Sequence, residues 1–326
     1  MADRGRIGRR GVLRSAAALG VGGALSAAGL PRRAFGDNFP SRPVKWLCYQ
    51  AAGGTMDLTI RGVQPFLEQH GVRTQIDYVV GGSGNVARTE LYSATPDGYT
   101  IMMESAPSAA LGELVTKGNY KSAEFEPIYG WSVEGWQIST KKGSPIRTIK
   151  DLIALSKKRP VVAASIGRGG PSHLQLILLG EIAGIKMNIV HFAGSSRAYP
   201  QAIGGNVDIV CAGPGSGSRS ADRLQFICVF RDHEPALPGV PSAKQQGYAV
   251  PSIDQIWYAD TAPKVPEDRV AKLEAAFAAA CTAPGFAAAQ AKAGILAIEQ
   301  LDRKRLAPLL KAGYELARKY QKDLTG

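Results

Sequence analysis

The sequence predicts an α/β fold of two lobes that two extended segments connect. From residue 44 onward, short apolar runs alternate with segments of helical periodicity, which is typical of α/β proteins. Glycine-rich loops follow several of the apolar runs, and two aromatic-rich segments without helical period interrupt the alternation. At 326 residues, with 45% hydrophobic and 20% charged residues, the chain has the composition of a packed protein of about two domains.

The first lobe begins with the apolar run VKWLCY at 44–49, which predicts a buried strand. Apolar residues then recur at helical spacing over 56–70, and Gly71 ends that helix. The elements that follow are a strand at 75–80, a glycine loop at 81–84, a helix at 85–93, a turn at 96–98 and a strand at 99–103. This β-α-β-α-β order implies parallel strands with right-handed crossovers.

The second lobe repeats the alternation of strand and helix. Its predicted strands are 161–166, 188–192, 207–211 and 224–230, its helices are 149–157, 173–183 and 198–203, and its loops include 167–172 and 214–220. Two further helices, 265–280 and 303–321, are predicted at the end of the chain.

Two extended segments, 125–138 and 253–259, are predicted to cross between the lobes. For the aromatic residues of these segments, packing in the core of the crossing strands is favoured over a ligand cage. These residues are Trp131, Trp136, Trp257 and Tyr258. The predicted boundaries are 37–135 and 258–326 for the first lobe and 136–257 for the second. Two lobes joined by such crossings are typical of a protein that closes on a ligand.

The segment 1–36 is predicted to be an export signal and no part of the fold. The motif RRGVLR at 9–14 reads as a twin-arginine signal, and a mild Ala/Gly/Leu stretch follows it. Small residues up to Gly36 suit cleavage after that residue, with an attached basic membrane anchor as the alternative. A twin-arginine signal directs export in bacteria, so we expect a periplasmic mature protein. No later apolar run reaches 18 residues, so we expect no other membrane span.

The charge distribution argues against nucleic-acid binding. The chain carries 39 basic and 27 acidic side chains, but residues 1–36 alone hold seven arginines against one acid. The rest of the chain has no run of five like charges, so it lacks the basic stripe that a nucleic acid requires. We therefore expect no nucleic-acid partner. We also expect a monomer.

Sequence motifs for metals, cofactors and catalysis are missing. The four histidines show no HxxxH or HExxH pairing, no Gly-x-Ser-x-Gly follows a strand, and the 167–172 loop lacks the third glycine of a dinucleotide fingerprint. We expect no metal, no cofactor and no catalytic residue, with a hydrolase-like enzyme as the lesser alternative. The four cysteines favour buried free thiols, with a Cys211–Cys228 bridge between neighbouring strands as the alternative.

Two glycine loops carry the predicted binding chemistry, one in each lobe. One follows the first strand of the first lobe (CYQAAGGTMD, 48–57), and the other follows the first strand of the second lobe (ASIGRGGPSH, 164–173). Ligands of parallel sheets bind at the carboxyl ends of the strands, beside helix starts whose N–H groups attract anions. Two such loops across a cleft suit a ligand with one or two acid groups.

Seven short segments, in this order along the chain, carry a family resemblance: FPSRPV (39–44), AGGTMD (52–57), GSGN (82–85), TPDGYT (95–100), GGPSHL (169–174), IGGNVDI (203–209) and LPGVPS (237–242). Together they resemble the substrate-binding proteins of tripartite tricarboxylate transporters, the Bug or TctC-like family. The resemblance covers residues 39–325.

The resemblance implies a periplasmic receptor with a type II binding-protein fold. Such a receptor captures a small organic carboxylate between its lobes, largely through main-chain amides and ordered waters, and delivers it to the membrane subunits of the transporter. A ligand-sensing receptor that docks on a periplasmic sensor domain is the alternative. The residues expected at the ligand are Gln50, Ala52, Gly53, Gly54, Thr55, Asp57, Ser105, Ala106, Ser165, Gly167, Arg168, Gly169, Gly170, Ser172, His173, Ala193, Gly194 and Ser195.

Four of these residues have two interpretations that the sequence leaves open. Gln50 could add a side-chain amide to the pocket, and Arg168 could hold a carboxylate with two hydrogen bonds or point to solvent. Asp57 could touch the ligand, but complementing the dipole of its helix is favoured. His173 could donate to a carboxylate or make a structural hydrogen bond.

Overall fold

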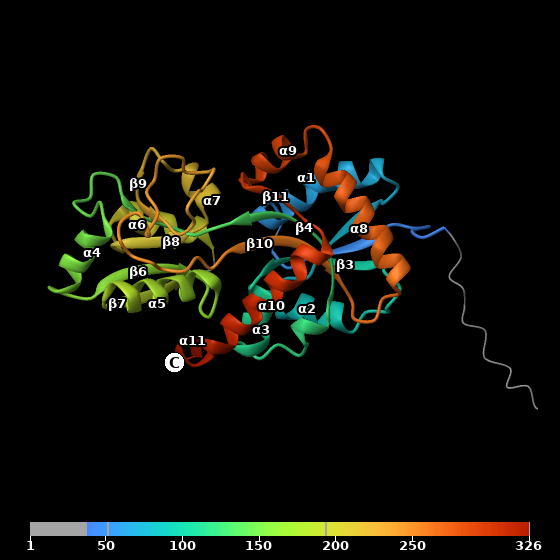
Figure 1. Cartoon of the computed structure of the whole chain (residues 1–326), viewed down its shortest axis with the longest axis horizontal. Coiled ribbons are helices and arrows are strands. Elements are labelled where there is room, and N and C mark those ends of the chain that lie inside the picture. Colours follow the sequence, from blue (N-terminus) through green and yellow to red (C-terminus); the bar gives the residue numbers. More distant parts are fainter. Residues whose placement is uncertain (1–37, 51, 193, 326) are drawn as a thin grey trace, which may run out of the picture. The chain divides into compact units, whose positions relative to one another are not determined.

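Two β-sheets organise the part of the chain described by the computed structural model, residues 38–50, 52–192 and 194–325 (Figure 1). The first sheet has the strand order β11-β4-β10-β3-β1-β2, and the second has the order β7-β6-β8-β5-β9. The export signal predicted at 1–36 lies outside these residues. Among the described residues, no helix combines the length and apolar character that a membrane span needs.

The first sheet joins parallel strands from early in the chain to antiparallel strands from later. Its strands are β1 (Val44–Cys48), β2 (Thr74–Tyr78), β3 (Thr100–Ala106), β4 (Glu126–Glu134), β10 (Gln255–Thr261) and β11 (Ile298–Leu301). As predicted, β1 pairs in parallel with both β2 and β3. β10 lies antiparallel between β3 and β4.

The helices whose sequences flank these strands are α1 (Thr55–Gln69), α2 (Asn85–Tyr92), α3 (Ser108–Leu114), α8 (Glu267–Thr282), α9 (Phe286–Ala293), α10 (Arg303–Lys319) and α11 (Gln321–Thr325). The helix predicted over 303–321 is therefore two helices, because the regular structure is interrupted at Tyr320. The short elements α3, α9 and β11 were not predicted.

The second sheet is built from β5 (Gln137–Lys141), β6 (Val161–Ile166), β7 (Met187–Phe192), β8 (Ile209–Ala212) and β9 (Leu224–Val229). β6 pairs in parallel with β7 and β8, while β5 is antiparallel to β8 and β9. Its helices are α4 (Ile149–Ser156), α5 (Pro171–Ala183), α6 (Ser195–Gly204) and α7 (Pro214–Ser218).

The chain passes between the two sheets along β4 and back along β10. The segment predicted as one crossing strand is two strands, because β4 ends at Glu134 and β5 begins at Gln137. β10 pairs with β4 on the return, and the two strands lie side by side in Figure 1. The lobe boundaries at 135/136 and 257/258 stay a prediction.

The loop predicted at 214–220 is wrong, because Pro214–Ser218 forms helix α7. Glycine and serine are weak helix formers, which is why the pattern predicted a loop. Proline suits a first helical turn, and a tertiary contact supports the helix. A Cβ atom on Gly215 would lie only 1.8 Å from the carbonyl oxygen of Gly294, so α7 packs directly against the backbone that precedes β11.

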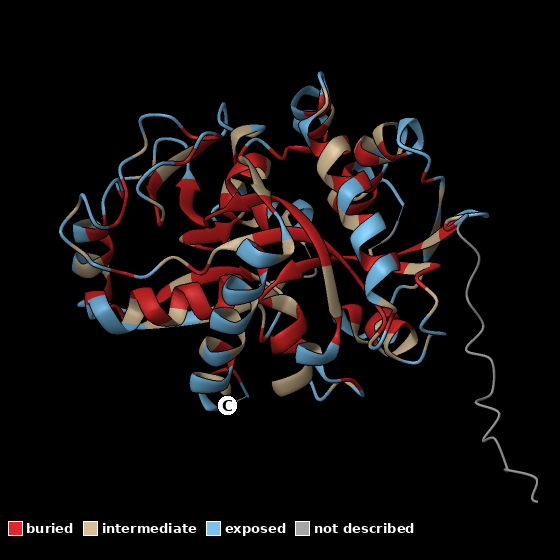
Figure 2. Ribbon diagram, turned by 45° about the vertical axis from the view of Figure 1, so that its right-hand side comes forward, coloured by how far each residue is buried: buried red, intermediate tan, exposed pale blue. Residues whose placement is uncertain are grey.

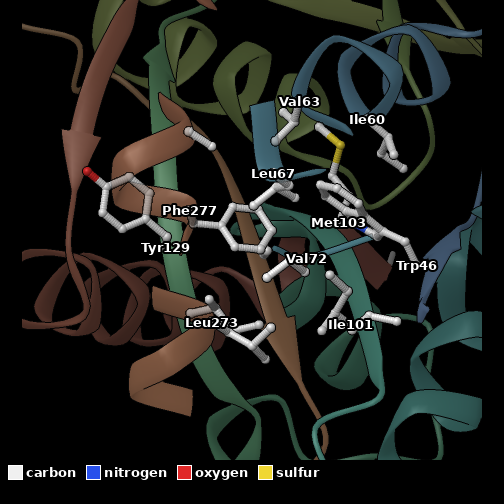
Figure 3. Close-up of a cluster of buried hydrophobic side chains, with 14 of the residues drawn as sticks. Trp46, Ile60, Val63, Leu67, Val72, Ile101, Met103, Tyr129, Leu273 and Phe277 are labelled. Atoms are coloured by element: carbon white, nitrogen blue, oxygen red, sulfur yellow. The ribbon is translucent and has the colours of Figure 1, made fainter. Parts of the chain in front are cut away.

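The core of the first sheet is aromatic and aliphatic (Figure 3). The Phe277 ring of α8 meets Trp46 edge-on, with 5.5 Å between ring centroids, and stacks on Trp131 at 6.1 Å. The predicted apolar stripe of α1 is buried, including Ile60 and Leu67. In the described part of the chain, buried residues follow the strands and exposed residues lie on the outer faces of the helices (Figure 2).

The four aromatic residues of the crossings are buried in the protein core, which agrees with the favoured interpretation: Trp131 is 0% exposed, Trp136 6%, Trp257 4% and Tyr258 4%. The four cysteines are buried free thiols. Cys211 and Cys228 both pair with Ile138 of β5, which lies between β8 and β9. The two cysteines are therefore not on neighbouring strands, and the alternative of a bridge between them is wrong.

Candidate functional site

The first glycine loop connects β1 to α1, and its own side chains hold it in place. The Gly53 N–H donates to Oδ2 of Asp57 at 2.7 Å, and the Met56 N–H donates to Oε1 of Gln50 at 3.3 Å. Gly53 has φ +79°, a left-handed conformation that glycine adopts without strain. Gln50 and Asp57 thus satisfy amides at the start of α1. Thr55 begins the helix, and Ala51 lies outside the described residues.

Asp57 is the most strongly bonded of the predicted site residues in this loop. Its side chain is 4% exposed, and its Oδ1 accepts hydrogen bonds from Arg61 Nε at 2.8 Å and from the Tyr78 hydroxyl at 2.7 Å. Burial alone would raise the pKa of this carboxyl, but the hydrogen bonds from Gly53, Tyr78 and Arg61 outweigh burial and lower it. Both carboxylate oxygens are therefore occupied within the protein.

A buried ion pair lies behind Ser105, which belongs to β3. The Arg88 guanidinium donates to both oxygens of Glu104, at 2.5 and 2.9 Å, and both residues are 0% exposed. The Ser105 N–H donates to Glu104, and the Ser105 hydroxyl is bonded to the Tyr49 hydroxyl at 3.2 Å. A bidentate ion pair of this kind holds both side chains in one orientation. Here it also holds the end of β3 and the ring of Tyr49 in place. Ala106 ends the strand and is buried.

The second glycine loop connects β6 to α5. The Gly167 N–H donates to the carbonyl of Phe192 at 2.9 Å, which ties the loop to the end of β7. The Gly169 N–H donates to Nδ1 of His173 at 3.2 Å. The Ser172 hydroxyl accepts from the Ile166 N–H at 2.7 Å and so caps the turn.

The amides of Gly53, Gly167, Gly169 and Gly170, all expected at the ligand, are thus bonded inside the protein. An incoming ligand can use them only by replacing their internal acceptors. Gly170 and Gly194 precede α5 and α6 as the N-cap residues, and Ser195 begins α6. Ala193 lies outside the described residues. In the first loop, Ala52 is exposed and Gly54 is half-exposed.

His173 and His191 form a close pair beside the second loop. Their ring centroids are 4.5 Å apart at 68°, and Nδ1 of His191 is 2.7 Å from the buried Ser165 hydroxyl. Burial, with smaller contributions from His191 and Arg168, lowers the pKa of His173 to about 4. Burial and the Arg168 charge also lower the pKa of His191. Arg168 is exposed, and its charge acts on both rings.

Side chains next to the first sheet reach the second loop. A Cβ atom on Gly169 would come within 2.8 Å of Cγ1 of Val115, the residue that follows α3. The neighbouring Thr116 accepts a hydrogen bond from Asn85 at 2.9 Å, and Asn85 begins α2. The loop between β6 and α5 therefore lies against the end of α3, close to the start of α2.

The start of α2 in turn lies beside the first loop. A Cβ atom on Gly84 would be 3.0 Å from the ring of Tyr49, and Tyr49 immediately precedes Gln50. The Arg88 guanidinium lies 4.9 Å from the centre of the same ring. Contacts of neighbouring residues thus connect the two predicted loops through α2 and α3.

Comparisons with known proteins identify the family. Residues 63–309 match the tripartite tricarboxylate transporter family receptor. The chain belongs to this family. The UPF0065 protein in the tcbD-tcbE intergenic region of Pseudomonas sp. (strain P51) is 28% identical to this receptor over 302 residues, which is 90% of this chain and 88% of the relative.

Two solved structures from Rhodopseudomonas palustris show the same fold. Rpa4515, solved with adipate, is 22% identical, has a TM-score of 0.77 and matches 88% of this chain and 98% of its own. MatC (Rpa3494), solved with bound malate, is 20% identical, has a TM-score of 0.74 and matches 88% of this chain and 100% of its own. The two-lobed type II α/β fold and the family resemblance predicted from the sequence are confirmed.

Several residues around the loops of this receptor were missed from the sequence. Tyr49, Arg88 and Glu104 form the buried support of the first loop, and His191 pairs with His173. Tyr49 and His191 carried a signal in the sequence, since Tyr49 lies within the 48–57 loop and His191 lies two residues before the 193–195 segment predicted at the ligand. Arg88 and Glu104 come from a helix face and a strand interior, where an apolar side chain is the usual occupant.

Two cavities are lined by residues outside these loops. One, of about 610 Å³, is lined by residues in and next to α1 and β2 that include Arg61, Arg73 and Tyr78. The other, of about 360 Å³, is lined by residues near the end of β9 that include Arg231 and Lys244. Neither contains a predicted ligand residue, and the described chain offers no group of three His, Cys, Asp or Glu side chains able to hold a metal ion.

Proposed function

We propose that this receptor binds a small organic carboxylate between its two lobes and delivers it to the membrane subunits of a tripartite tricarboxylate transporter. The observation that carries the proposal is membership of the receptor family over residues 63–309. The chemistry supports it, because glycine loops follow β1 and β6 and lead into α1 and α5. Helix starts of this kind attract anions through their N–H groups.

The proposed site consists of the two loops, the end of β3 and the start of α6. In this arrangement Asp57 and Gln50 position the first loop, because their oxygens already accept amide hydrogen bonds. Arg168 supplies positive charge at the mouth of the second loop, beside His173. The bound ligand is contacted by loop amides and by the side chains of Ser195 and Thr55.

Location, lobe boundaries and assembly complete the proposal. The receptor is exported by the twin-arginine pathway, cleaved after Gly36 and active in the periplasm, as the RRGVLR motif and its flanking sequence favour. It acts as a monomer. Residues 37–135 and 258–326 form one lobe, and residues 136–257 form the other. The receptor captures its ligand and does not transform it.

The first prediction is that a small organic acid stabilises the protein. The probes are adipate, malate, the other C3–C8 dicarboxylates, citrate, hydroxy acids and aromatic acids, each added to the purified protein during thermal unfolding. A ligand that binds only the folded protein, present at about 100 times its Kd, adds about 2.7 kcal/mol to the free energy of unfolding. We expect at least one acid to raise the melting temperature in a saturable way.

Uncharged analogues serve as the matched control, and the corresponding amides or alcohols are expected to leave the melting temperature unchanged. The proposal fails if no acid stabilises the protein, or if an amide stabilises it as well as the acid does. Conversion of any of these acids into product, followed by NMR, would favour the enzyme alternative instead.

A further inference from the structure

His191 has a place in the site that family membership does not assign to it. It comes from β7, while its neighbours Ser165 and His173 come from β6 and α5. Ser165 pairs with His191 in the β6–β7 register, so both side chains project from the same face of the sheet. The ring of His191 is partly exposed, whereas Ser165 is 0% and His173 is 8% exposed. His191 is therefore the member of this group that a ligand can reach.

The hydrogen bonds of the two rings differ in one decisive respect. Nδ1 of His173 accepts the Gly169 N–H, so a proton on that nitrogen would break the bond and leave two donors facing each other. Nδ1 of His191 faces the Ser165 hydroxyl, and a hydroxyl can either donate or accept. His191 can therefore become an imidazolium without losing its partner, and His173 cannot.

Among the residues that the structure describes, the surroundings of His191 supply no negative charge. The groups that face it are His173 of α5, Arg168 of the second loop and Ser165 of β6. The charged residue of α6, Arg197, belongs to a helix that packs on the opposite face of the sheet, against Val190 and Phe192. Glu113, the acid of α3, is bonded to Ser122, and no ion pair to His191 occurs among the described residues.

We propose that His191 takes up one proton when the carboxylate ligand binds and donates it in a hydrogen bond to the ligand. The proton comes from solvent. In the resulting imidazolium, Nδ1–H donates to the Ser165 hydroxyl, and Nε2–H donates to a carboxylate oxygen. This inference rests on the function proposed above and adds that capture by this receptor is linked to pH.

The linkage has a definite sign. In the free protein, burial and Arg168 hold the pKa of His191 below its ordinary value of 6.5, so the ring is neutral at pH 7. A bound carboxylate stabilises the imidazolium and raises that pKa. Affinity therefore increases as the pH falls, by at most about tenfold per pH unit, between the bound-state and the free-state pKa.

The test is calorimetry of the full-length protein with adipate, malate and every other acid that stabilises it in the thermal assay. Each titration is performed in two buffers of different ionisation enthalpy at one pH, and then repeated from about pH 5 to about pH 8. The difference in binding enthalpy between the buffers gives the number of protons taken up. We expect a fraction of a proton that grows toward one within the linkage window.

Three variants assign the proton to one ring. His191→Gln keeps an N–H donor near the Nε2 position but cannot be protonated, so it should bind with no proton uptake and little pH dependence. His70→Gln and His233→Gln change exposed histidines outside this group and should behave like the wild type. The ¹⁵N shifts of His191 should show the imidazolium in the liganded protein alone.

Each outcome decides between two conclusions. Binding without proton uptake, or uptake that persists in His191→Gln, overturns the role of His191 and leaves the proposed receptor function intact. Failure of every acid to bind overturns the receptor function and this inference with it. Should His191→Gln fail to fold, the ¹⁵N shifts of the wild type with and without ligand still decide the question.

Discussion

Single side chains around the two loops mainly hold backbone in place. Asp57 satisfies the Gly53 N–H, and the His173 ring satisfies the Gly169 N–H. A loop whose amides are tied down in this way has already lost most of its freedom before a ligand arrives, so less conformational entropy is lost on binding. The buried Arg88–Glu104 pair likewise holds Tyr49 in place, because both residues contact the Tyr49 side chain. Either partner without the other would be an uncompensated buried charge.

Asp57→Asn should destabilise the protein by about 1–3 kcal/mol at neutral pH. The substitution removes the charged carboxylate that accepts hydrogen bonds from Arg61 and from the Gly53 N–H. The pKa of Asp57 is lowered on folding below the ordinary value of 3.8. Its stabilisation is therefore complete above that value and is lost as the pH falls through the folded-state pKa. Urea unfolding of both proteins at neutral and strongly acidic pH measures the difference.

Asp232→Asn is the matched control, because Asp232 pairs with Lys244 on an exposed surface, where an ion pair contributes little. A pH-independent difference between Asp57→Asn and the wild type would contradict the role of the Asp57 charge.

Helices and strands bring distant loops into contact through small residues. Gly169 lets the turn before α5 approach Val115 after α3, and Gly215 lets α7 approach the backbone at Gly294. Each contact joins a segment next to a strand of the second sheet to a segment that flanks the first sheet, one after α3 and the other between α9 and β11. The lobes are thus in contact through backbone and small side chains in this structure.

Gly169→Ala and Gly167→Ala form a matched pair that isolates the contact with Val115. Both positions have positive φ, +70° and +82°, so each substitution carries the left-handed strain of about 1–2 kcal/mol. Only at position 169 would the new Cβ meet a neighbour, Cγ1 of Val115 at 2.8 Å, whereas position 167 faces open space. We expect Gly169→Ala to lose more stability and more ligand affinity than Gly167→Ala.

Adding Val115→Ala to Gly169→Ala should restore part of both losses, because it removes the atom that the new Cβ meets. Unfolding in urea and calorimetry with a stabilising acid measure the two quantities. Equal effects of the two glycine substitutions, or no rescue by Val115→Ala, would show that this contact does not matter for binding.

The whole chain is organised around the two crossings, and an acid is buried where they meet. Glu134 ends β4, and its Oε2 accepts a hydrogen bond from the Trp257 indole of β10 at 3.1 Å. Glu234, which accepts from the Gly135 N–H, is a second acid nearby. Burial raises the pKa of Glu134 to about 7, with a smaller contribution from Glu234.

Glu134→Gln should gain stability relative to the wild type as the pH rises. The pKa of Glu134 is about 7 in the folded protein and 4.5 ordinarily. Its contribution to the free energy of unfolding of the wild type is therefore complete below about pH 4.5 and is lost as the pH rises through 7. His173 acts in the opposite direction over an overlapping range, since its pKa is lowered to about 4. Both proteins contain His173, so its contribution cancels when the unfolding free energy of the wild type is subtracted from that of Glu134→Gln, each measured in urea.

The control for this series is Glu315→Gln, which changes a half-exposed acid of α10. Its stability difference from the wild type should stay constant over the same pH range. Parallel pH profiles of Glu134→Gln and the wild type would mean that folding leaves the pKa of Glu134 at its ordinary value of 4.5.

Local patterns in the sequence were sufficient for the fold class, most of the strands, the main helices and the two glycine loops. Each of these depends on neighbouring residues, since apolar spacing records which face of a strand or helix is buried, and glycine marks a turn. The errors concerned interruptions of predicted elements and short elements such as α7, whose glycine-rich sequence predicted a loop and which packs against Gly294.

The tertiary structure alone decided which groups at the loops are occupied and which are accessible. Ser165, His173 and His191 are separated along the chain and meet because β6 pairs with β7 beneath α5. Likewise, no pattern in the sequence pairs Arg88 with Glu104. A hydrogen bond depends on positions in space, and residues far apart in the chain come together only when the sheets and helices pack.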